Sequence, residues 1–243
     1  MARRFPGRTT VKLILHGPGE TRTAVFLKRY QSDYLSLSRK LLRVIRWPTA
    51  TDEAWREWSM LHELRARNIG TARPVAVGQE KALGNVVRSF VMTEEIAGGE
   101  PGDRFCAQLD FTERREFAKE LGALARKFHG SGFVHKDFYL GHIFVVRENG
   151  RRHLRVIDLQ RVTRPLFFKG RWRTKDLSAL AYSALNSGMS NTDLLRIFEA
   201  YLQTQKLNFA DKQLVRKIVD RVAWLRTRRP KHDDLPASAN QPP

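Results

Sequence analysis

Two carboxylates stand at the opposite ends of one predicted hairpin. Asp137 lies in the stretch FVHKDFYLGHIF, residues 133–144, where polar side chains interrupt an apolar run. Asp158 ends a second apolar run, in VIDLQ. The dipeptide Asn149-Gly150 between the two runs is a strong signal for a tight hairpin turn. The two carboxylates can therefore point into the same space.

Phosphoryl transfer is a reaction that uses such a pair. One carboxylate would orient an attacking hydroxyl and accept its proton, and the other would hold Mg²⁺ at the nucleotide phosphates. A cation must also contact the phosphates. Lys28, at the end of the strand AVFLK, can supply that cation, and Glu57 on a downstream helix can pair with it. The alternative is a structural turn, since a single loop Asp is usually a cap and a strand Lys is usually solvated.

The first 95 residues are predicted to form a small, strand-rich lobe. Its helix at 51–70 can be capped by Thr51 or Asp52, and its tryptophans Trp55 and Trp58 are expected to pack in the core. A second helix, at 34–47, is amphipathic and basic. The remaining pattern predicts a hairpin and two short strands, at 9–30, 73–80 and 85–96.

Residues 96–228 are predicted to form a larger, mainly helical lobe. A long helix at 112–130 has Thr112 and Glu116 near its start. Further helices are predicted after the hairpin at 142–160, over 175–189, 191–205 and 210–228. Residues 229–243 have the composition of a disordered tail. The fold class is therefore α+β with two lobes, and the join near 93–102 is a common kind of place for a ligand.

Composition limits the class of partner and compartment. The net charge is +19, from 44 basic and 25 acidic residues, which predicts attraction to polyanions. The single cysteine, Cys106, cannot form an internal disulfide and favours the cytosol. No apolar run is long enough for a membrane span, and the N-terminus lacks the apolar core of a signal peptide.

Three short motifs resemble those of the protein-kinase-like fold. H-K-D-F-Y-L-G-H at 135–142 is similar to the catalytic loop H-x-D-x-x-x-x-N, V-F-L-K at 25–28 to V-A-I-K, and I-D-L-Q at 157–160 to the D-F-G position. His142 stands where Asn is usual. Together with R-E-W at 56–58, G-R-T-T at 7–10 and R-W-R-T-K-D at 171–176, this resembles the bacterial lipopolysaccharide core kinases, which phosphorylate heptose or Kdo sugars.

The resemblance, which covers about residues 5–205, implies a role for each matching position. Asp137 would be the catalytic base, Asp158 the main Mg²⁺ ligand, and Lys28 the anchor on the α- and β-phosphates with Glu57 as its ion-pair partner. His142 takes the place of the second metal ligand, but imidazole is a poor ligand for Mg²⁺, so contact with a phosphate or a purely structural role stays open. The other implied positions are Gly7, Glu94 and Glu95 for nucleotide binding, and His135 and Asp176 for support of the catalytic loop.

Several departures from the kinase pattern shape the expected substrate. No G-x-G-x-x-G is present, Leu159 and Gln160 replace the Phe and Gly of D-F-G, and no A-P-E element follows. The short segment between Asp158 and Asp176 leaves little room for a peptide-docking platform. Its basic residues suit an acceptor with phosphates or carboxylates, although a solvated basic loop is the alternative. The candidate acceptor-binding residues are Arg161, Arg164, Lys169, Arg171 and Arg173.

The sequence therefore predicts an ATP- and Mg²⁺-dependent kinase that acts on a sugar of the lipopolysaccharide core, an anionic glycolipid. It is expected in the cytoplasm, and the basic helix at 34–47 leaves room for peripheral contact with anionic lipid at the inner face of the inner membrane. One alternative is a kinase-like phosphotransferase for another small-molecule or protein acceptor. Another is a basic pseudokinase or nucleic-acid-binding module, against which the intact Lys28, Asp137 and Asp158 argue. The sequence does not determine the oligomeric state.

Overall fold

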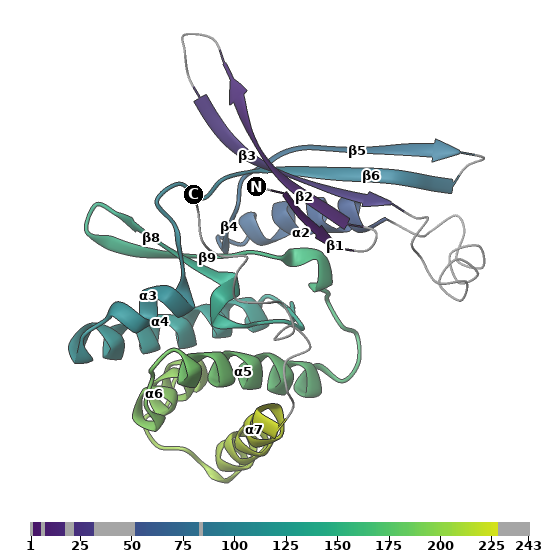
Figure 1. Ribbon diagram of the computed structural model, residues 1–243. Helices are drawn as coiled ribbons and strands as arrows, with labels where there is room; N and C mark the ends of the chain where they lie inside the picture. The colour runs from purple at the N-terminus through teal and green to yellow at the C-terminus, as the bar shows by residue number, and fades with distance from the viewer. Residues whose placement is uncertain (1, 6–7, 18–21, 32–51, 83–84, 228–243) are drawn as a thin grey trace.

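The computed structural model describes residues 2–5, 8–17, 22–31, 52–82 and 85–227. It confirms the predicted α+β architecture, with an antiparallel sheet in the N-terminal part and helices in the C-terminal part (Figure 1). Three predictions lie outside the described residues: Gly7, the basic helix at 34–47 and the tail at 229–243.

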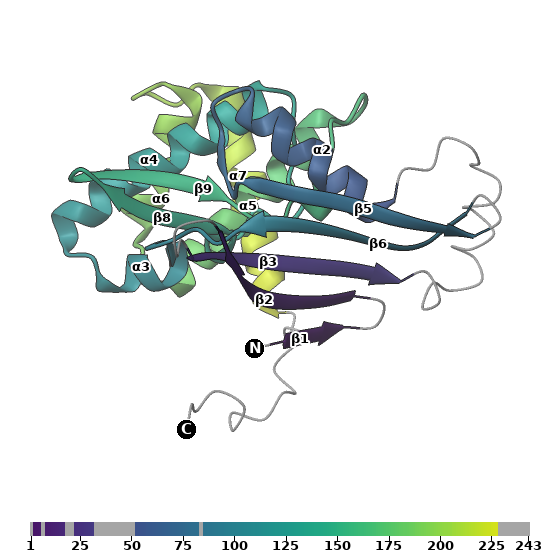
Figure 2. The ribbon, with the colours of Figure 1, turned by 90° about the horizontal axis from the view of Figure 1, so that it is seen from above.

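The N-terminal sheet has five antiparallel strands in the order β1-β2-β3-β6-β5. Figure 2 shows these strands side by side from above. The hairpin and the two strands that the sequence predicts are present, whereas β1, which lies before the predicted hairpin, was not expected. The strands are β1 (Ala2–Phe5), β2 (Arg8–His16), β3 (Arg22–Gln31), β5 (Pro74–Ala82) and β6 (Asn85–Glu94).

Helix α2 (Glu53–Arg65) packs under this sheet (Figure 1). Asp52 caps it by accepting a hydrogen bond from the backbone N–H of Trp55, at 2.8 Å. The prediction that both tryptophans pack in the core is wrong for Trp55, which is 38% exposed. Trp58 is partly buried and packs against the core. The face that turns inward instead carries Ala54, Glu57, Leu61 and Leu64, because Glu57 has polar partners on the sheet.

A second sheet, of four strands in the order β4-β9-β8-β7, lies between the N-terminal sheet and the helices (Figure 1). Its centre is the predicted hairpin, with the turn at Asn149-Gly150, where both residues have positive φ as such a turn requires. The outer strands have two residues each, too few for a sequence pattern to indicate. The strands are β4 (Gly70–Thr71), β7 (Glu100–Pro101), β8 (Ile143–Glu148) and β9 (Arg151–Val156).

The C-terminal helices correct one predicted start. Helix α4 begins at Phe111, one residue before the predicted start, so Thr112 and Glu116 lie near its beginning as expected, and Asp110 and Glu113 form its capping box. Helix α5 begins at Lys169, well before the predicted residue 175. The residue before it, Phe168, has no polar side chain to cap the helix, so the sequence carries no signal for this start. The helices are α3 (Gly102–Gln108), α4 (Phe111–Gly130), α5 (Lys169–Asn186), α6 (Asn191–Leu202) and α7 (Phe209–Thr227), with short 3₁₀ turns η3 (Leu140–His142) and η4 (Leu159–Arg161).

One apolar core runs from Tyr30 and Val91 of the N-terminal sheet to Val222 of α7. Cys106 is buried in this core, and burial raises the pKa of its thiol to about 11, so it serves as packing. No helix among the described residues has the length and apolar character needed to cross a bilayer.

Helices α4 and α6 approach closely at Gly122. A Cβ added there would lie 2.3 Å from the Ile197 carbonyl oxygen and 2.7 Å from the Ala200 Cβ. We expect Gly122→Ala to lower the free energy of unfolding by about 1–3 kcal/mol, because overpacking forces the helices apart. Urea denaturation measures this effect.

Gly130, at the end of the same helix, is the matched control, because a Cβ there would meet no atom within 4 Å. Gly130→Ala should leave stability unchanged or raise it slightly. Equal stability of the two variants would contradict the close packing of α4 on α6.

Candidate active site

Lys28 lies in the middle of the N-terminal sheet, on β3, opposite Thr10 of β2 and Val91 of β6. Its ammonium group is hydrogen-bonded and ion-paired to Oε1 of Glu57 on α2. Tyr30, two residues along β3, donates its hydroxyl to Oε2 of Glu57 at 2.7 Å. Burial, and secondly the charge of Glu57, raise the pKa of Tyr30 far above its ordinary value, so Tyr30 stays a neutral donor. Both oxygens of Glu57 are therefore held in place.

Two basic side chains of the N-terminal sheet lie close to the carboxylate of Asp158. Its Oδ1 lies 4.0 Å from the ammonium nitrogen of Lys28 and 3.5 Å from a guanidinium nitrogen of Arg8 on β2. The structure thus brings Lys28, Glu57 and Asp158 together, as predicted. Arg8 was missed, although it belongs to the G-R-T-T motif that the sequence singled out.

The paired ends of the β8–β9 hairpin bring His142 and Asp158 together. Ile143 pairs with Val156, and the backbone N–H of Ile157 donates to the carbonyl of His142 at 2.9 Å. The Nε2 atom of His142 lies 4.0 Å from Oδ2 of Asp158. Asp158 itself has φ of 57°, a left-handed conformation that turns the chain into η4.

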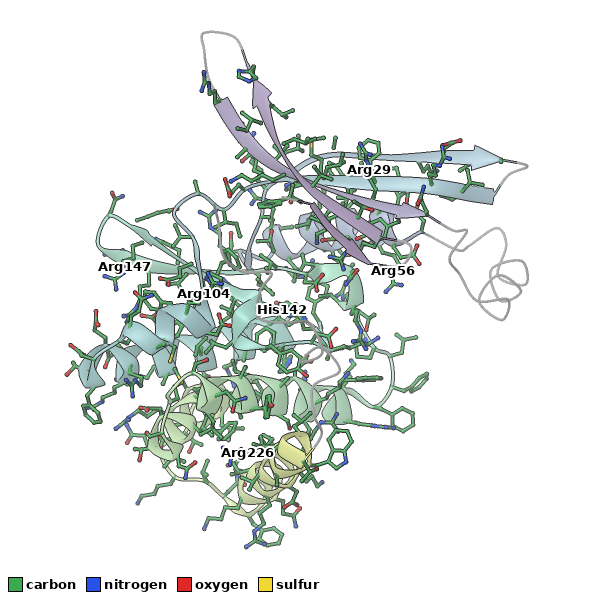
Figure 3. All side chains as sticks on the ribbon, viewed as in Figure 1. Arg29, Arg56, Arg104, His142, Arg147 and Arg226 are labelled. Atoms are coloured by element: carbon green, nitrogen blue, oxygen red, sulfur yellow. The ribbon has the colours of Figure 1, made fainter. Side chains whose placement is uncertain are left out.

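The same His142 ring also contacts the loop that carries Asp137. Its Nδ1 is 2.8 Å from the carbonyl oxygen of Asp137, and because a carbonyl only accepts, the proton sits on Nδ1. The other ring nitrogen, Nε2, therefore faces Asp158. In Figure 3, His142 lies near the middle of the molecule, where the second sheet meets the helices.

Asp176 fixes the backbone of the Asp137 loop. Its carboxylate is fully buried and accepts the backbone N–H groups of His135, at 2.6 Å, and Lys136, at 2.7 Å. It also contacts Nε2 of His129 at 3.3 Å. Lys136 has φ of 70°, so the loop turns sharply just before Asp137. The prediction placed Asp176 at a helix start, whereas it lies about two turns inside α5.

His135 supports the loop from below. Its ring is buried, its Nε2 lies 3.0 Å from the carbonyl oxygen of Ile157, and it stacks on the His142 ring with centroids 6.0 Å apart. Burial lowers the pKa of His135, so the ring is neutral and Nε2 carries the donated proton. The ring thereby joins the Asp137 loop to the end of β9.

The carboxylate of Asp137 is bound by Arg161. One guanidinium nitrogen lies 2.8 Å from Oδ1 and 2.7 Å from Oδ2. Among the predicted acceptor-binding residues, the structure places Arg161 alone on Asp137. Arg164 instead pairs with Glu63 at 3.3 Å, Arg173 donates to the carbonyl of His129 at 3.0 Å, and Lys169 and Arg171 lie exposed at the start of α5.

Three further cations lie near Arg161 and were not predicted. Partial burial, then the charges of Arg56, Arg161 and Lys175, lower the pKa of Lys136. Lys136 and Lys175 share the ring of Trp172, at 5.0 and 5.7 Å from its centroid. We call Arg56, Lys136, Arg161 and Lys175 the cationic cluster; Figure 3 shows Arg56 on α2, below the N-terminal sheet. The sequence did contain a hint of this cluster, because Lys136 and Lys175 directly precede the two predicted site residues Asp137 and Asp176.

The two predicted nucleotide-binding acids lie where β6 leaves the N-terminal sheet. Glu94 pairs with Arg73 at 3.3 Å. Glu95 pairs with Lys12 at 2.6 Å, and its backbone N–H donates to the carbonyl of Ala24. Both carboxylates are thus engaged with the sheet.

Two features together define the class of kinase-like phosphotransferases. One is the ion pair between a lysine of the antiparallel sheet and a glutamate of the helix packed on it, and the other is a pair of carboxylates that precede and follow the β8–β9 hairpin. A model of the lipopolysaccharide kinase (Kdo/WaaP) family matches residues 20–201, and the chain belongs to this family.

Known relatives share much of the chain. The lipopolysaccharide core heptose(I) kinase WaaP of Escherichia coli is 30% identical over 186 residues, which are 72% of this chain and 69% of that protein. WaaP of Pseudomonas aeruginosa is 26% identical over 234 residues, covering 92% of this chain and 82% of that protein. A solved structure of WaaP in complex with acyl carrier protein shares the fold, with a TM-score of 0.68 at 23% identity, covering 92% of this chain and 84% of that chain. The sequence leaves open whether a partner protein supports the chain.

The burial of Asp176 yields a stability prediction. In Asp176→Asn, the amide keeps one acceptor oxygen but turns its own N–H₂ donors toward the second backbone N–H. We expect the free energy of unfolding to fall by about 3 kcal/mol, because hydrogen bonds to a buried charge are lost. Urea denaturation measures the change.

The exposed Asp220 on α7 provides the control. Asp220→Asn should leave the free energy of unfolding within about 0.5 kcal/mol of the parent chain. A similar small effect of Asp176→Asn would contradict the support role of its carboxylate.

Proposed function

We propose that this chain is an ATP- and Mg²⁺-dependent kinase that phosphorylates a sugar hydroxyl, of heptose or Kdo, in the lipopolysaccharide core. The observation that carries the proposal is the convergence of Lys28, Asp158 and Asp137 around His142: Asp158 lies 4.0 Å from the Lys28 ammonium nitrogen and from Nε2 of His142, whose Nδ1 binds the carbonyl oxygen of Asp137 at 2.8 Å. Family membership and the names of the relatives support the acceptor class. Residues 1–95 would cover the nucleotide, and residues 96–228 would supply the catalytic loop, the metal ligand and the acceptor site.

The nucleotide phosphates would meet Lys28 and Arg8. Glu57 holds the Lys28 ammonium on the side of the sheet that faces Asp158. Arg8 adds a second positive charge from the neighbouring strand. Glu94 and Glu95 lie at the exit of β6, where adenosine contacts are proposed for the backbone rather than for their ion-paired carboxylates.

The residues present fit a magnesium ion that arrives with the nucleotide. Among the described residues, no group of three or more His, Cys, Asp or Glu side chains is arranged to hold a metal ion. Mg²⁺ often takes one or two protein carboxylates and completes its shell with phosphates and water. Asp158 would hold the ion, which would neutralise charge on the phosphates during transfer. His142 lies next to Asp158, and its imidazole stands where the kinase pattern has an asparagine.

Asp137 would accept the proton of the attacking sugar hydroxyl. Asp176 and His135 fix the loop that carries it, so the carboxylate is presented without a search of backbone conformations. Arg161 holds both carboxylate oxygens in this structure. An acceptor that carries phosphate or carboxylate groups can bind Arg161 and its neighbours in the cationic cluster, which would free Asp137 toward the hydroxyl.

The architecture favours a glycolipid acceptor over a protein. Between η4 and α5 only residues 162–168 remain, too few for a peptide-docking platform. The cationic cluster would complement the acidic groups of the core. We place the enzyme in the cytoplasm, in peripheral contact with the inner face of the inner membrane, where its charge of +19 favours anionic lipid.

The assignment of the base has a direct test. Asp137→Asn should lower transfer of phosphate from ATP to dephosphorylated core lipopolysaccharide by about a hundredfold to ten-thousandfold, the usual contribution of a general base. ATP binding, measured by calorimetry, should persist because Asp137 is not proposed to contact the nucleotide.

Asp220→Asn serves again as the control and should transfer phosphate at the parent rate. Undiminished transfer by Asp137→Asn would remove Asp137 as the base. A screen of labelled ATP against core lipopolysaccharide, small hydroxylated metabolites and proteins distinguishes the alternative acceptors. Tight RNA binding with no ATP turnover would favour the nucleic-acid-binding alternative.

His142 should make the enzyme less selective for magnesium. Amide oxygen suits Mg²⁺, whereas imidazole nitrogen suits Mn²⁺ better. We expect His142→Asn to lower the ratio of Mn²⁺-supported to Mg²⁺-supported kcat/KM several-fold, measured in parallel titrations of the two ions. An unchanged ratio in a folded, active variant would show that the ring only shapes the site.

A further inference from the structure

Three consecutive large apolar residues stand out of the surface next to the proposed active site. Leu166, Phe167 and Phe168 are 83%, 75% and 78% exposed, and they lie in the segment that joins η4 to α5. Single exposed apolar residues are common on soluble proteins, but an exposed run of three is avoided unless it contacts something.

The backbone holds this run in a defined place. At its base, Thr163 forms a bridge with Val134, with N–O distances of 2.9 and 3.0 Å, so the segment is tied to the chain just before the Asp137 loop. At its other end, the carbonyl of Phe168 accepts the N–H of Trp172 in the first turn of α5. Phe168 has φ of 57°, which is unusual for a bulky residue and turns the chain sharply into the helix. The apolar side chains are thus presented by a fixed turn.

Cations surround the apolar run. Arg164 precedes it, with a side chain 51% exposed, and Lys169 and Arg171 follow it, both exposed. The first turn of α5 contains no acidic residue, and Phe168 gives its backbone N–H groups no side-chain cap, so the positive end of the helix dipole adds to these charges. The cationic cluster continues the positive surface toward Asp137.

We propose that residues 164–171 are a membrane-docking loop, whose apolar tip enters the interfacial region of an anionic bilayer while its flanking cations contact lipid headgroups. An apolar tip framed by Lys and Arg is the pattern of interfacial membrane binding. A stable protein interface needs roughly 800 Å² on each partner with apolar residues spread over its centre, which a single three-residue tip does not provide. The occupant that fits is therefore a lipid surface.

Docking here deepens the proposed function and rests on it in one respect. If the acceptor is a glycolipid, the loop brings the surface that contains it next to Arg161 and Asp137, since Thr163 bridges to the chain before the Asp137 loop. The recognition of lipid itself involves no phosphoryl transfer. Vesicle binding and kinase activity can therefore be measured apart.

The test is co-sedimentation of the full chain with vesicles of phosphatidylglycerol and phosphatidylethanolamine, compared with vesicles of phosphatidylcholine alone. We expect binding to the anionic vesicles, and a loss of about tenfold in partition for Phe167→Ser, because the serine side chain gains nothing from leaving water for the interfacial region. Phe209→Ser is the matched control, since Phe209 is also 75% exposed but lies at the start of α7. This control should bind vesicles like the parent chain.

Several outcomes would overturn the proposal. Failure of the parent chain to bind anionic vesicles would do so, as would equal binding by the parent and Phe167→Ser, or equal losses in both variants. Sedimentation velocity without lipid checks a second copy as the occupant. A parent dimer that dissociates in Phe167→Ser, with vesicle binding unchanged, would assign the loop to self-association instead.

A kinase assay with two acceptors separates this proposal from the proposed function. With a soluble, deacylated core oligosaccharide, Phe167→Ser should transfer phosphate at the parent rate. With dephosphorylated core lipopolysaccharide in anionic vesicles, its rate should fall by about the same factor as its partition. Absence of transfer by the parent chain to either acceptor would reject the kinase assignment while leaving the vesicle result intact. Equal rates of the parent chain and Phe167→Ser on the vesicle-borne acceptor would reject the docking loop while leaving the kinase assignment intact.

Discussion

The carboxylate of Asp176 is shielded from water, and a buried charge is tolerated only when hydrogen bonds replace its hydration. Two backbone N–H groups of the Asp137 loop and the ring of His129 provide them. His129 in turn contacts the hydroxyl of Tyr201 at 3.1 Å, so α4, α5 and α6 meet at this one charge. The loop cannot take another backbone path without leaving Asp176 unsatisfied. The position of Asp137 is therefore set by the helical core.

The rest of the site consists of acid–cation pairs. Asp158, just after β9, lies near Lys28 and Arg8 of the N-terminal sheet, and Asp137 is paired with Arg161 of η4. In both cases an acid is matched to a cation while neighbouring cations stay available. Such an arrangement is stable without ligand and still attracts one, because incoming phosphates can share cations that the acids already orient.

The sequence predicts the chemistry better than it predicts the boundaries. The grouping of Lys28, Glu57 and Asp158 could be predicted because these residues match motifs of the kinase-like family in order and spacing, and Asn149-Gly150 fixes the hairpin between Asp137 and Asp158. The start of α5 could not be predicted, because Phe168 is a helix cap without a polar signal. Trp55 was assigned to the core because apolar periodicity cannot reveal that Glu57 is buried by partners on another element. Lys136, Lys175 and Arg56 come together only through tertiary folding, which no local spacing encodes.

The short strand β4 has a mechanical consequence for the molecule. Gly70 and Thr71 follow α2 closely and pair in parallel with Arg155 and Val156, just before Asp158. A side chain at position 70 would collide with the carbonyl of Leu154, at 2.4 Å, so the contact is tight. The chain that follows α2 is thus hydrogen-bonded to β9, the strand that leads to Asp158. This contact is separate from the covalent link between the two sheets, which runs through residues 95–99 after β6. A movement of α2 that shifted Glu57 would therefore act on Asp158 as well, because β4 ties the chain after α2 to the strand that ends just before Asp158.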